Sequence, residues 1–138
     1  MEEGIVPGGG VALLNALSSI DDLKMEYEDE NIGVKIVQRS MTVPMMGIAE
    51  NAGQDGAVIV QEVRRRQGEA KNQSLGYDVI TGEFVDMVEA GIIDPAKVTK
   101  GALENAASIA AMILTTEALI TDMPEESGPP AGPPMPEY

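Results

Sequence analysis

The 138-residue sequence contains no cysteine and no histidine. It therefore cannot form a disulfide, a thiolate nucleophile, a histidine general base or a zinc site built from nitrogen and sulfur ligands. Basic residues are scarce as well, with 9 Lys and Arg against 23 Asp and Glu and a net charge of −14. Such a chain repels phosphate backbones and anionic lipid surfaces, so we expect neither nucleic acid nor a membrane as a partner.

Two further deficits narrow the fold class. No apolar run approaches the roughly 20 residues that cross a bilayer, and the acidic residues Glu2 and Glu3 are unlike the basic region of a signal peptide. Aromatic residues make up only 3% of the chain, and Trp is absent. Packing must therefore rest on Ala, Val, Ile, Leu and Met, which favours close contact of helix on helix.

Apolar residues recur at helical spacing in two segments of the first half of the chain. The first segment predicts a short amphipathic helix over 11–20, with apolar positions at Val11, Leu14, Leu17 and Ile20. After an acidic connection over 21–30, an apolar face over 32–45 predicts a longer helix. Pro44 lacks an N–H and disfavours the α conformation at Val43, so we expect a kink or two helices that meet there.

The clearest helix signal lies in the second half of the chain. Asp94 and Pro95 suit the N-cap and the first helical position, and the helical pattern ends near Glu117. The buried stripe predicted for this helix is rich in alanine and comprises Val98, Ala102, Ala106, Ile109, Ala110 and Ile113. Small residues allow close approach of a neighbouring helix, so we expect this to be the core helix.

Short β-structure is predicted between and after these helices. Residues 57–63 fit a strand by their β-branched content or a helix by the charges that follow, and the sequence leaves both open. Residues 77–80 predict a small hairpin or an isolated strand, and 84–90 a brief helical turn. We expect an edge strand at 118–121 and a flexible Pro/Gly-rich tail over 125–138. The whole pattern indicates a mainly α fold with short β-strands.

Two places in this pattern suit a ligand. Three glycines, Gly8 to Gly10, precede a helix, where backbone can approach an anion closely. No Lys-Ser/Thr pair follows them, so they are no P-loop and serve equally well as a simple turn. The carboxylates of Asp78 and Asp94 suit ribose hydroxyls, a metal or proton transfer, although a loop acid and a helix cap explain them too.

Three blocks of sequence, taken together and in order, resolve this ambiguity. They are Glu2–Leu13 (EEGIVPGGGVAL), Gly76-Tyr77-Asp78 and Gly91–Val98 (GIIDPAKV). These blocks closely resemble group I chaperonins, the GroEL/Hsp60 family. The resemblance implies that residues 1–124 are the carboxy-terminal half of a chaperonin equatorial domain, the multihelical domain that binds ATP and makes most contacts within and between rings.

The resemblance also implies a set of ATP-binding residues. Gly9 would lie against the nucleotide, Asp78, Val79 and Ile80 would line the adenosine pocket, and Asp94 would hold the ribose hydroxyls. At 78–80 the bacterial archetype has an Asn-Ala-Ala type sequence, and the Asp found here looks more like the mitochondrial type. The bulkier Val79 and Ile80 would narrow the pocket if their side chains point inward.

In this family the phosphate loop, the magnesium-binding Asp and the Asp that assists hydrolysis belong to segments outside this sequence. We therefore expect no catalytic and no metal-binding residue here, and no useful ATP hydrolysis by this chain alone. The implied partners are other ring subunits, partly through the strand at 118–121. Co-chaperonin and unfolded proteins would bind only through domains that this chain lacks.

The resemblance places the protein in the bacterial cytoplasm or the mitochondrial matrix. A second hypothesis, of a different class, is a truncated interaction module that oligomerises without binding nucleotide. It is motivated by the altered sequence at 78–80 and by the ligand groups that the chain lacks.

Overall fold

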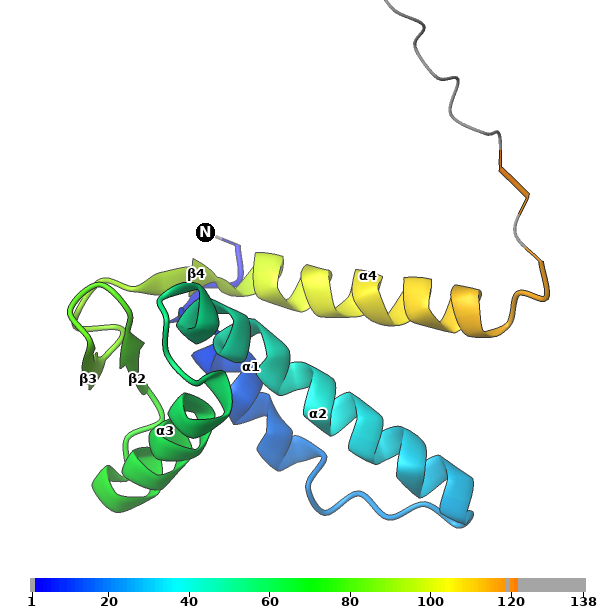
Figure 1. Ribbon diagram of the computed structural model, residues 1–138, viewed down its shortest axis with the longest axis horizontal. Helices are drawn as coiled ribbons and strands as arrows, with labels where there is room; N and C mark the ends of the chain where they lie inside the picture. Colours follow the sequence, from blue (N-terminus) through cyan, green and yellow to red (C-terminus); the bar gives the residue numbers. More distant parts are fainter. Residues whose placement is uncertain (1, 119, 122–138) are drawn as a thin grey trace, which may run out of the picture.

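Helices carry most of the described chain, and four strands of three or four residues lie between them (Figure 1). The structure is a computed structural model that describes residues 2–118, 120 and 121. In chain order the elements are β1 (Ile5–Pro7), α1 (Val11–Ala16), the 3-10 helix η1 (Leu17–Ser19), α2 (Glu28–Asn51), α3 (Gly56–Ala70), β2 (Leu75–Asp78), β3 (Glu83–Asp86), β4 (Ile93–Pro95) and α4 (Ala96–Leu114). The predicted mainly α fold with short strands is confirmed.

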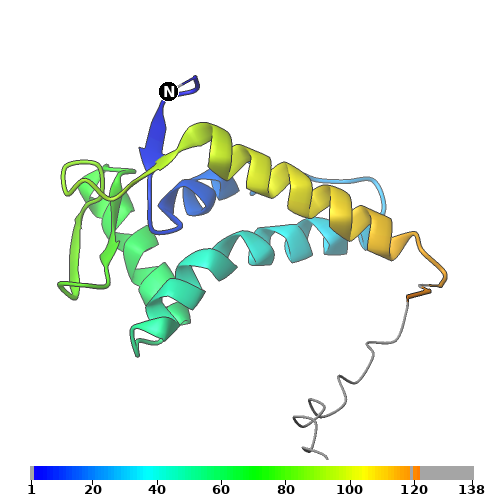
Figure 2. The ribbon, with the colours of Figure 1, turned by 90° about the horizontal axis from the view of Figure 1, so that it is seen from above.

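The hydrophobic core lies where α1, α2 and α3 meet at one end of the molecule (Figures 1 and 2). Its buried side chains are Val11, Leu14, Leu17, Met41, Met45, Ala49, Ile59, Val60, Val63 and Met87. On α2 the buried positions recur every four residues, which is the spacing of one helical face. The core is aliphatic and rich in methionine, as the shortage of aromatic residues predicts.

The helix α2 is continuous through Pro44, so the expectation of two separate helices at this point is wrong. Met41 and Met45, on either side of Pro44, are buried on the same face against the same core. Pro44 removes the donor that would reach the carbonyl of Ser40, but it lies on an exposed part of the helix. Tertiary packing of the buried face outweighs this local loss.

The ambiguous segment 57–63 is helical and forms the first half of α3. Asp55 caps the helix, since its carboxylate accepts hydrogen bonds from the backbone N–H groups of Ala57 at 3.0 Å and Val58 at 3.1 Å. The β-branched residues that suggested a strand, Ile59, Val60 and Val63, are buried on one side of this helix.

The strands form two antiparallel pairs. A hairpin of β2 and β3 places Tyr77 opposite Phe84, so of the two alternatives predicted near 77–80, a hairpin or an isolated strand, the hairpin is observed. The helical turn expected at 84–90 is wrong for its first half, because β3 covers 83–86. Its second half is a turn, in which the N–H of Ala90 donates to the carbonyl of Asp86 at 2.9 Å. Sequence reasoning missed the second pair, in which β1 joins β4 and Val6 lies opposite Asp94.

The beginning of α4 differs from its prediction. Asp94 belongs to β4, and Pro95 holds the N-cap position without a side-chain hydrogen bond, so Asp94 is not the helix cap. The helix ends at Leu114 rather than near Glu117. Its first turns are tied to the start of the chain by an ion pair of Lys97 with Glu2.

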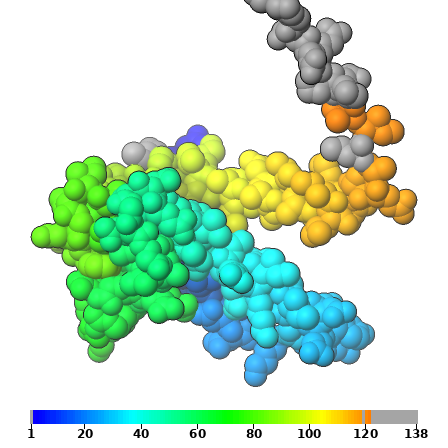
Figure 3. Space-filling view, viewed as in Figure 1, coloured from blue at the N-terminus to red at the C-terminus, as the bar shows by residue number. Residues whose placement is uncertain are grey.

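The role expected for α4 as the core helix is wrong for this chain, since none of its residues is buried. Val98 is 64% exposed, Ile109 57% and Ile113 67%. The helix extends from β4 as an arm, and open space separates its outer half from α2 (Figures 1 and 3). In the part of the chain that the structure describes, no helix has both the length and the apolar character of a membrane span.

The strand expected at 118–121 is not seen at Ala118, Ile120 or Thr121, and Leu119 lies outside the described residues. The predicted tail over 125–138 lies outside them as well.

Candidate functional site

The glycine turn predicted as a ligand contact joins β1 to α1. Gly9 and Gly10 have φ angles of +64° and +81°, a left-handed conformation that favours glycine. The N–H of Gly8 donates to the carbonyl of Ile92 at 2.9 Å, which holds the turn beside the segment that leads into β4. The turn therefore links the start of the chain to the residues just before Asp94.

A pocket of about 430 Å³ opens beside this turn, and we call it the glycine pocket. It lies between the start of α1, the second half of α2 and the first turns of α4. Among the residues that line it are Gly9, Leu13, Pro44, Ile48, Asp94 and Val98. Its volume lies within the range of small-molecule sites, about 300 to 1,000 Å³. The structure thus brings together two of the predicted site residues, Gly9 and Asp94.

Asp94 is the single charged residue in the described lining of the glycine pocket. Its side chain makes no hydrogen bond within the described chain, so its carboxylate oxygens are available to hydroxyl donors of a ligand. The opposite walls are apolar and come from Leu13, Pro44, Ile48 and Val98. The arrangement suits a ligand with an apolar ring at one end and hydroxyl groups at the other.

No Lys or Arg lines the described part of the glycine pocket. A phosphate chain placed here would meet no cation from these residues. Among residues 2–118, 120 and 121, moreover, no group of three or more Asp or Glu residues gathers closely enough to hold a metal ion.

The structure does not bring residues 78–80 to the glycine pocket. They lie in the turn of the β2–β3 hairpin, where the Asp78 carboxylate accepts hydrogen bonds from the N–H of Ile80 and the hydroxyl of Thr81, both at 2.9 Å. These bonds lower the pKa of Asp78 below its ordinary value. Ile80 is 91% exposed and Val79 is half-buried. Asp78 therefore acts within this structure as a turn residue.

Sequence reasoning missed the apolar lining of the glycine pocket, Leu13, Pro44, Ile48 and Val98. Apolar residues at helical spacing are usually core residues, so their pattern alone could not separate a pocket wall from a core. The exposed proline in the middle of α2 was the one available signal, since nothing in the core requires it there.

A family model described as the TCP-1/cpn60 chaperonin family matches residues 1–124. The chain belongs to this chaperonin family. Among solved structures, the crystal structure of a group III chaperonin in the open state is similar with a TM-score of 0.73 and 33% identity. This match covers 85% of the present chain and 24% of that chaperonin.

An open-state monomer of a group II chaperonin from Methanococcoides burtonii is similar with a TM-score of 0.70 and 32% identity, over 81% of this chain and 28% of that one. The chain thus spans about a quarter of the length of these chaperonins. The chaperonin family predicted from three sequence blocks is confirmed. The assignment to group I stays a prediction, since these two structures are of groups III and II.

Proposed function

We propose that this chain is the carboxy-terminal half of the ATP-binding equatorial domain of a group I chaperonin ring subunit, in a bacterial cytoplasm or a mitochondrial matrix. One observation carries the nucleotide-binding part of the proposal. Gly9 and Asp94, which lie far apart in the sequence, line one pocket. The order of the three sequence blocks supports the group and the domain.

The chemistry of the glycine pocket fits the adenosine part of ATP. Leu13, Ile48 and Val98 form walls against which a base can pack, and the backbone of Gly9 lines the pocket beside them. The Asp94 carboxylate accepts hydrogen bonds from ribose hydroxyls, as carboxylates do in other nucleotide sites. The phosphates and magnesium belong to groups elsewhere in a full-length subunit, because the described lining holds no cation and one carboxylate.

The test is a titration of the 138-residue chain with adenosine, monitored by residue-resolved NMR. We expect saturable shifts at Gly9, Leu13 and Val98 in the millimolar range. Asp94→Ala should weaken binding about tenfold, which corresponds to roughly 1.4 kcal/mol and to the loss of a charged hydrogen bond. Asp29→Ala, at the exposed start of α2, is the matched control and should bind as the parent does.

Because the described lining of the glycine pocket holds no cation, ATP should bind there no more than about twofold more tightly than adenosine. If the Gly9 signal does not shift, or if Asp94→Ala binds adenosine as tightly as the parent, the glycine pocket is not an adenosine site.

The exposed apolar side of α4 favours the second hypothesis, an oligomerising module without nucleotide binding. Under both hypotheses the partners are further ring subunits, while co-chaperonin and unfolded proteins engage parts of a full-length subunit outside this chain. Self-association together with a negative adenosine titration would favour the module.

A further inference from the structure

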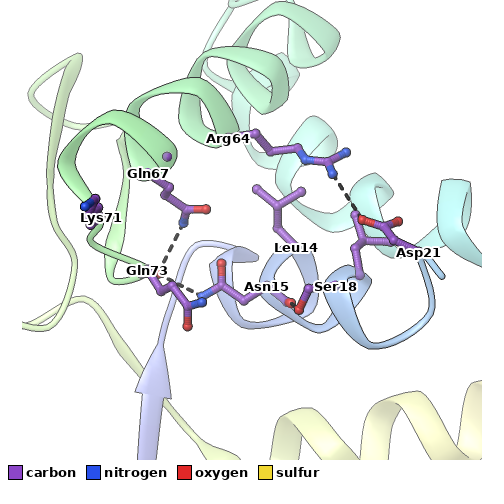
Figure 4. Close-up of a pocket in the computed structure, with 10 residues that line it drawn as sticks. Leu14, Asn15, Ser18, Asp21, Arg64, Gln67, Lys71 and Gln73 are labelled. Atoms are coloured by element: carbon purple, nitrogen blue, oxygen red, sulfur yellow. Dashed lines mark hydrogen bonds and ion pairs between the residues drawn. The ribbon is translucent and has the colours of Figure 1, made fainter.

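A second pocket, of about 410 Å³, lies on the other side of α1 from the glycine pocket (Figure 4). We call it the α3 pocket, because one side of α3 forms one of its walls. Arg64, Gly68 and Lys71 lie along this side, with Leu14 of α1 across from them and Asp21 and Gln73 at its edges. None of these residues belongs to the proposed adenosine site.

The walls of the α3 pocket are fixed by hydrogen bonds that converge on the loop after α3. The side-chain amide of Gln67 donates to the carbonyl of Gln73 at 3.2 Å and to that of Leu75 at 2.8 Å. From the opposite wall, the side-chain amide of Asn15 donates to the same Gln73 carbonyl at 2.8 Å. The pocket therefore has a shape that exists before any ligand enters.

Lys71 has an unusual backbone for its residue type. It is the C-cap of α3 with φ 52° and ψ 35°, and it is the single non-glycine residue with positive φ in the described chain. Glycine, or less often asparagine, is the usual residue at a left-handed helix end, because a Cβ is strained there. The Lys71 side chain makes no hydrogen bond or ion pair within the described residues. The left-handed conformation ends α3, with the N–H groups of Lys71 and Asn72 both donating to the carbonyl of Gln67. The fold therefore explains the backbone at this position, and the lysine side chain is free to contact a ligand.

The charge around the α3 pocket is positive, whereas the net charge of the whole chain is negative. Lys71 and Arg64 lie two helical turns apart on the same side of α3, against one carboxylate, that of Asp21. Arg64 is paired with Asp21 at 3.4 Å, which leaves Lys71 as the unpaired cation. Between them, Gly68 has no atom within 4 Å of the position that a Cβ would take, so the space above the helix is open.

We propose that the α3 pocket binds a small molecule with a carboxylate or phosphate group, held by the Lys71 ammonium with the Arg64 guanidinium as a second cation. The open space over Gly68 takes the rest of the ligand.

The experiment titrates the 138-residue chain with inorganic phosphate and, separately, with acetate at constant ionic strength, again with residue-resolved NMR. The two anions separate a phosphate site from a carboxylate site. We expect saturable shifts at Gly68, Lys71 and Gln73 below about 10 mM, where a site with a Kd near 1 mM is mostly filled. Gly9 and Asp94 should not shift, which makes the result independent of the adenosine site.

Lys71→Gly separates a binding role from a structural one. It should weaken anion binding at least about fivefold and leave the Tm equal or higher, because glycine is relaxed at this φ. Lys71→Asn should behave in the same way, and Lys35→Gln, on exposed α2, should leave binding unchanged. Absence of saturable shifts with both anions, or equal binding by Lys71→Gly and the parent, would overturn the proposal.

Discussion

Gly10 lies so close to the backbone of Met45 that a Cβ at Gly10 would stand 2.8 Å from the Met45 nitrogen and 3.0 Å from its Cα. This contact seats the start of α1 on the middle of α2. It also sets the distance between the two walls of the glycine pocket, since Gly9 and Leu13 lie on one side of the contact and Ile48 on the other. The glycine turn is therefore a packing element as well as a candidate ligand contact.

Gly10→Ala should lower the free energy of unfolding by about 2 to 5 kcal/mol. Roughly 1 to 2 kcal/mol comes from the left-handed backbone at φ +81°. A further 1 to 3 kcal/mol, approximately, comes from overpacking against a backbone that cannot rotate away. Urea unfolding followed by circular dichroism measures the change.

Gly47→Ala is the matched control for this substitution. Gly47 lies within α2, and no atom comes within 4 Å of its Cβ position, so alanine there should stabilise the chain by about 0.5 to 1 kcal/mol. Equal unfolding midpoints for the parent and Gly10→Ala would show that α1 does not rest on α2 in this way.

The features that could be predicted from sequence are those set by local pattern. The helix predicted over 11–20, which is observed as α1 followed by the 3-10 helix η1, and the long helix that includes Met41 and Met45 follow from apolar spacing. The hairpin is consistent with the turn residues Thr81 and Gly82. The family follows from ordered blocks whose combined length makes chance agreement small. Each of these signals lies within a short stretch of chain.

The features that were missed depend on contacts between distant residues. Phe84 reads locally as part of a helical turn, but its ring packs on Tyr77 with 5.0 Å between centroids and lies 4.1 Å from the Arg66 guanidinium carbon. These contacts hold Phe84 in a strand. Asp94 reads as a helix cap, yet pairing with Val6 draws it into β4. Local propensity cannot report such pairings.

The candidate site was predictable in part for the same reason. Gly9 and Asp94 each stand in a recognisable block, and both reach the glycine pocket. Its apolar walls at Pro44 and Ile48 look like core positions, because a helical pattern shows which side is apolar and not what covers it. The apolar stripe on α4 shows the same limit. It correctly predicts a helix, but the burial predicted for the stripe is wrong.

Glu62 provides a prediction for the acid stability of the chain. Its carboxylate accepts hydrogen bonds from Arg65 at 2.6 and 2.9 Å and from Arg66 at 2.6 Å, and these lower its pKa from 4.5 to about 2. A carboxyl whose pKa is lower in the folded chain stabilises the fold above its unfolded pKa. The contribution of Glu62 is therefore complete above pH 4.5 and is lost as the pH falls toward 2.

Glu62→Gln should flatten the fall of the unfolding midpoint between pH 4.5 and 2, with a small effect because the three side chains are partly exposed to solvent. Urea unfolding at a series of pH values gives this slope. Glu104→Gln, on the exposed α4, should retain the slope of the parent. An identical slope in Glu62→Gln would mean that the cluster with Arg65 and Arg66 does not form in solution.

The exposed stripe of α4 predicts self-association of the 138-residue chain. Ile109, Met112 and Ile113 are each more than half exposed, and the described outer half of the helix has no covering element. Such a patch favours contact with another apolar surface. Ile113→Glu should weaken self-association at least about tenfold, because burying one such side chain contributes roughly 1.5 to 3 kcal/mol. Sedimentation velocity over a concentration series measures the constant.

Ala107→Glu introduces the same charge on the opposite side of α4. Position 107 shares this side with Glu104, three residues earlier, and with Lys100, four residues before Glu104. Self-association through the apolar stripe requires that this variant behave as the parent does. If Ala107→Glu and Ile113→Glu disperse the chain equally, added net charge rather than the stripe is responsible. If the parent chain stays monomeric at every concentration, the exposed stripe of α4 does not drive association, which would count against an interaction role for this helix.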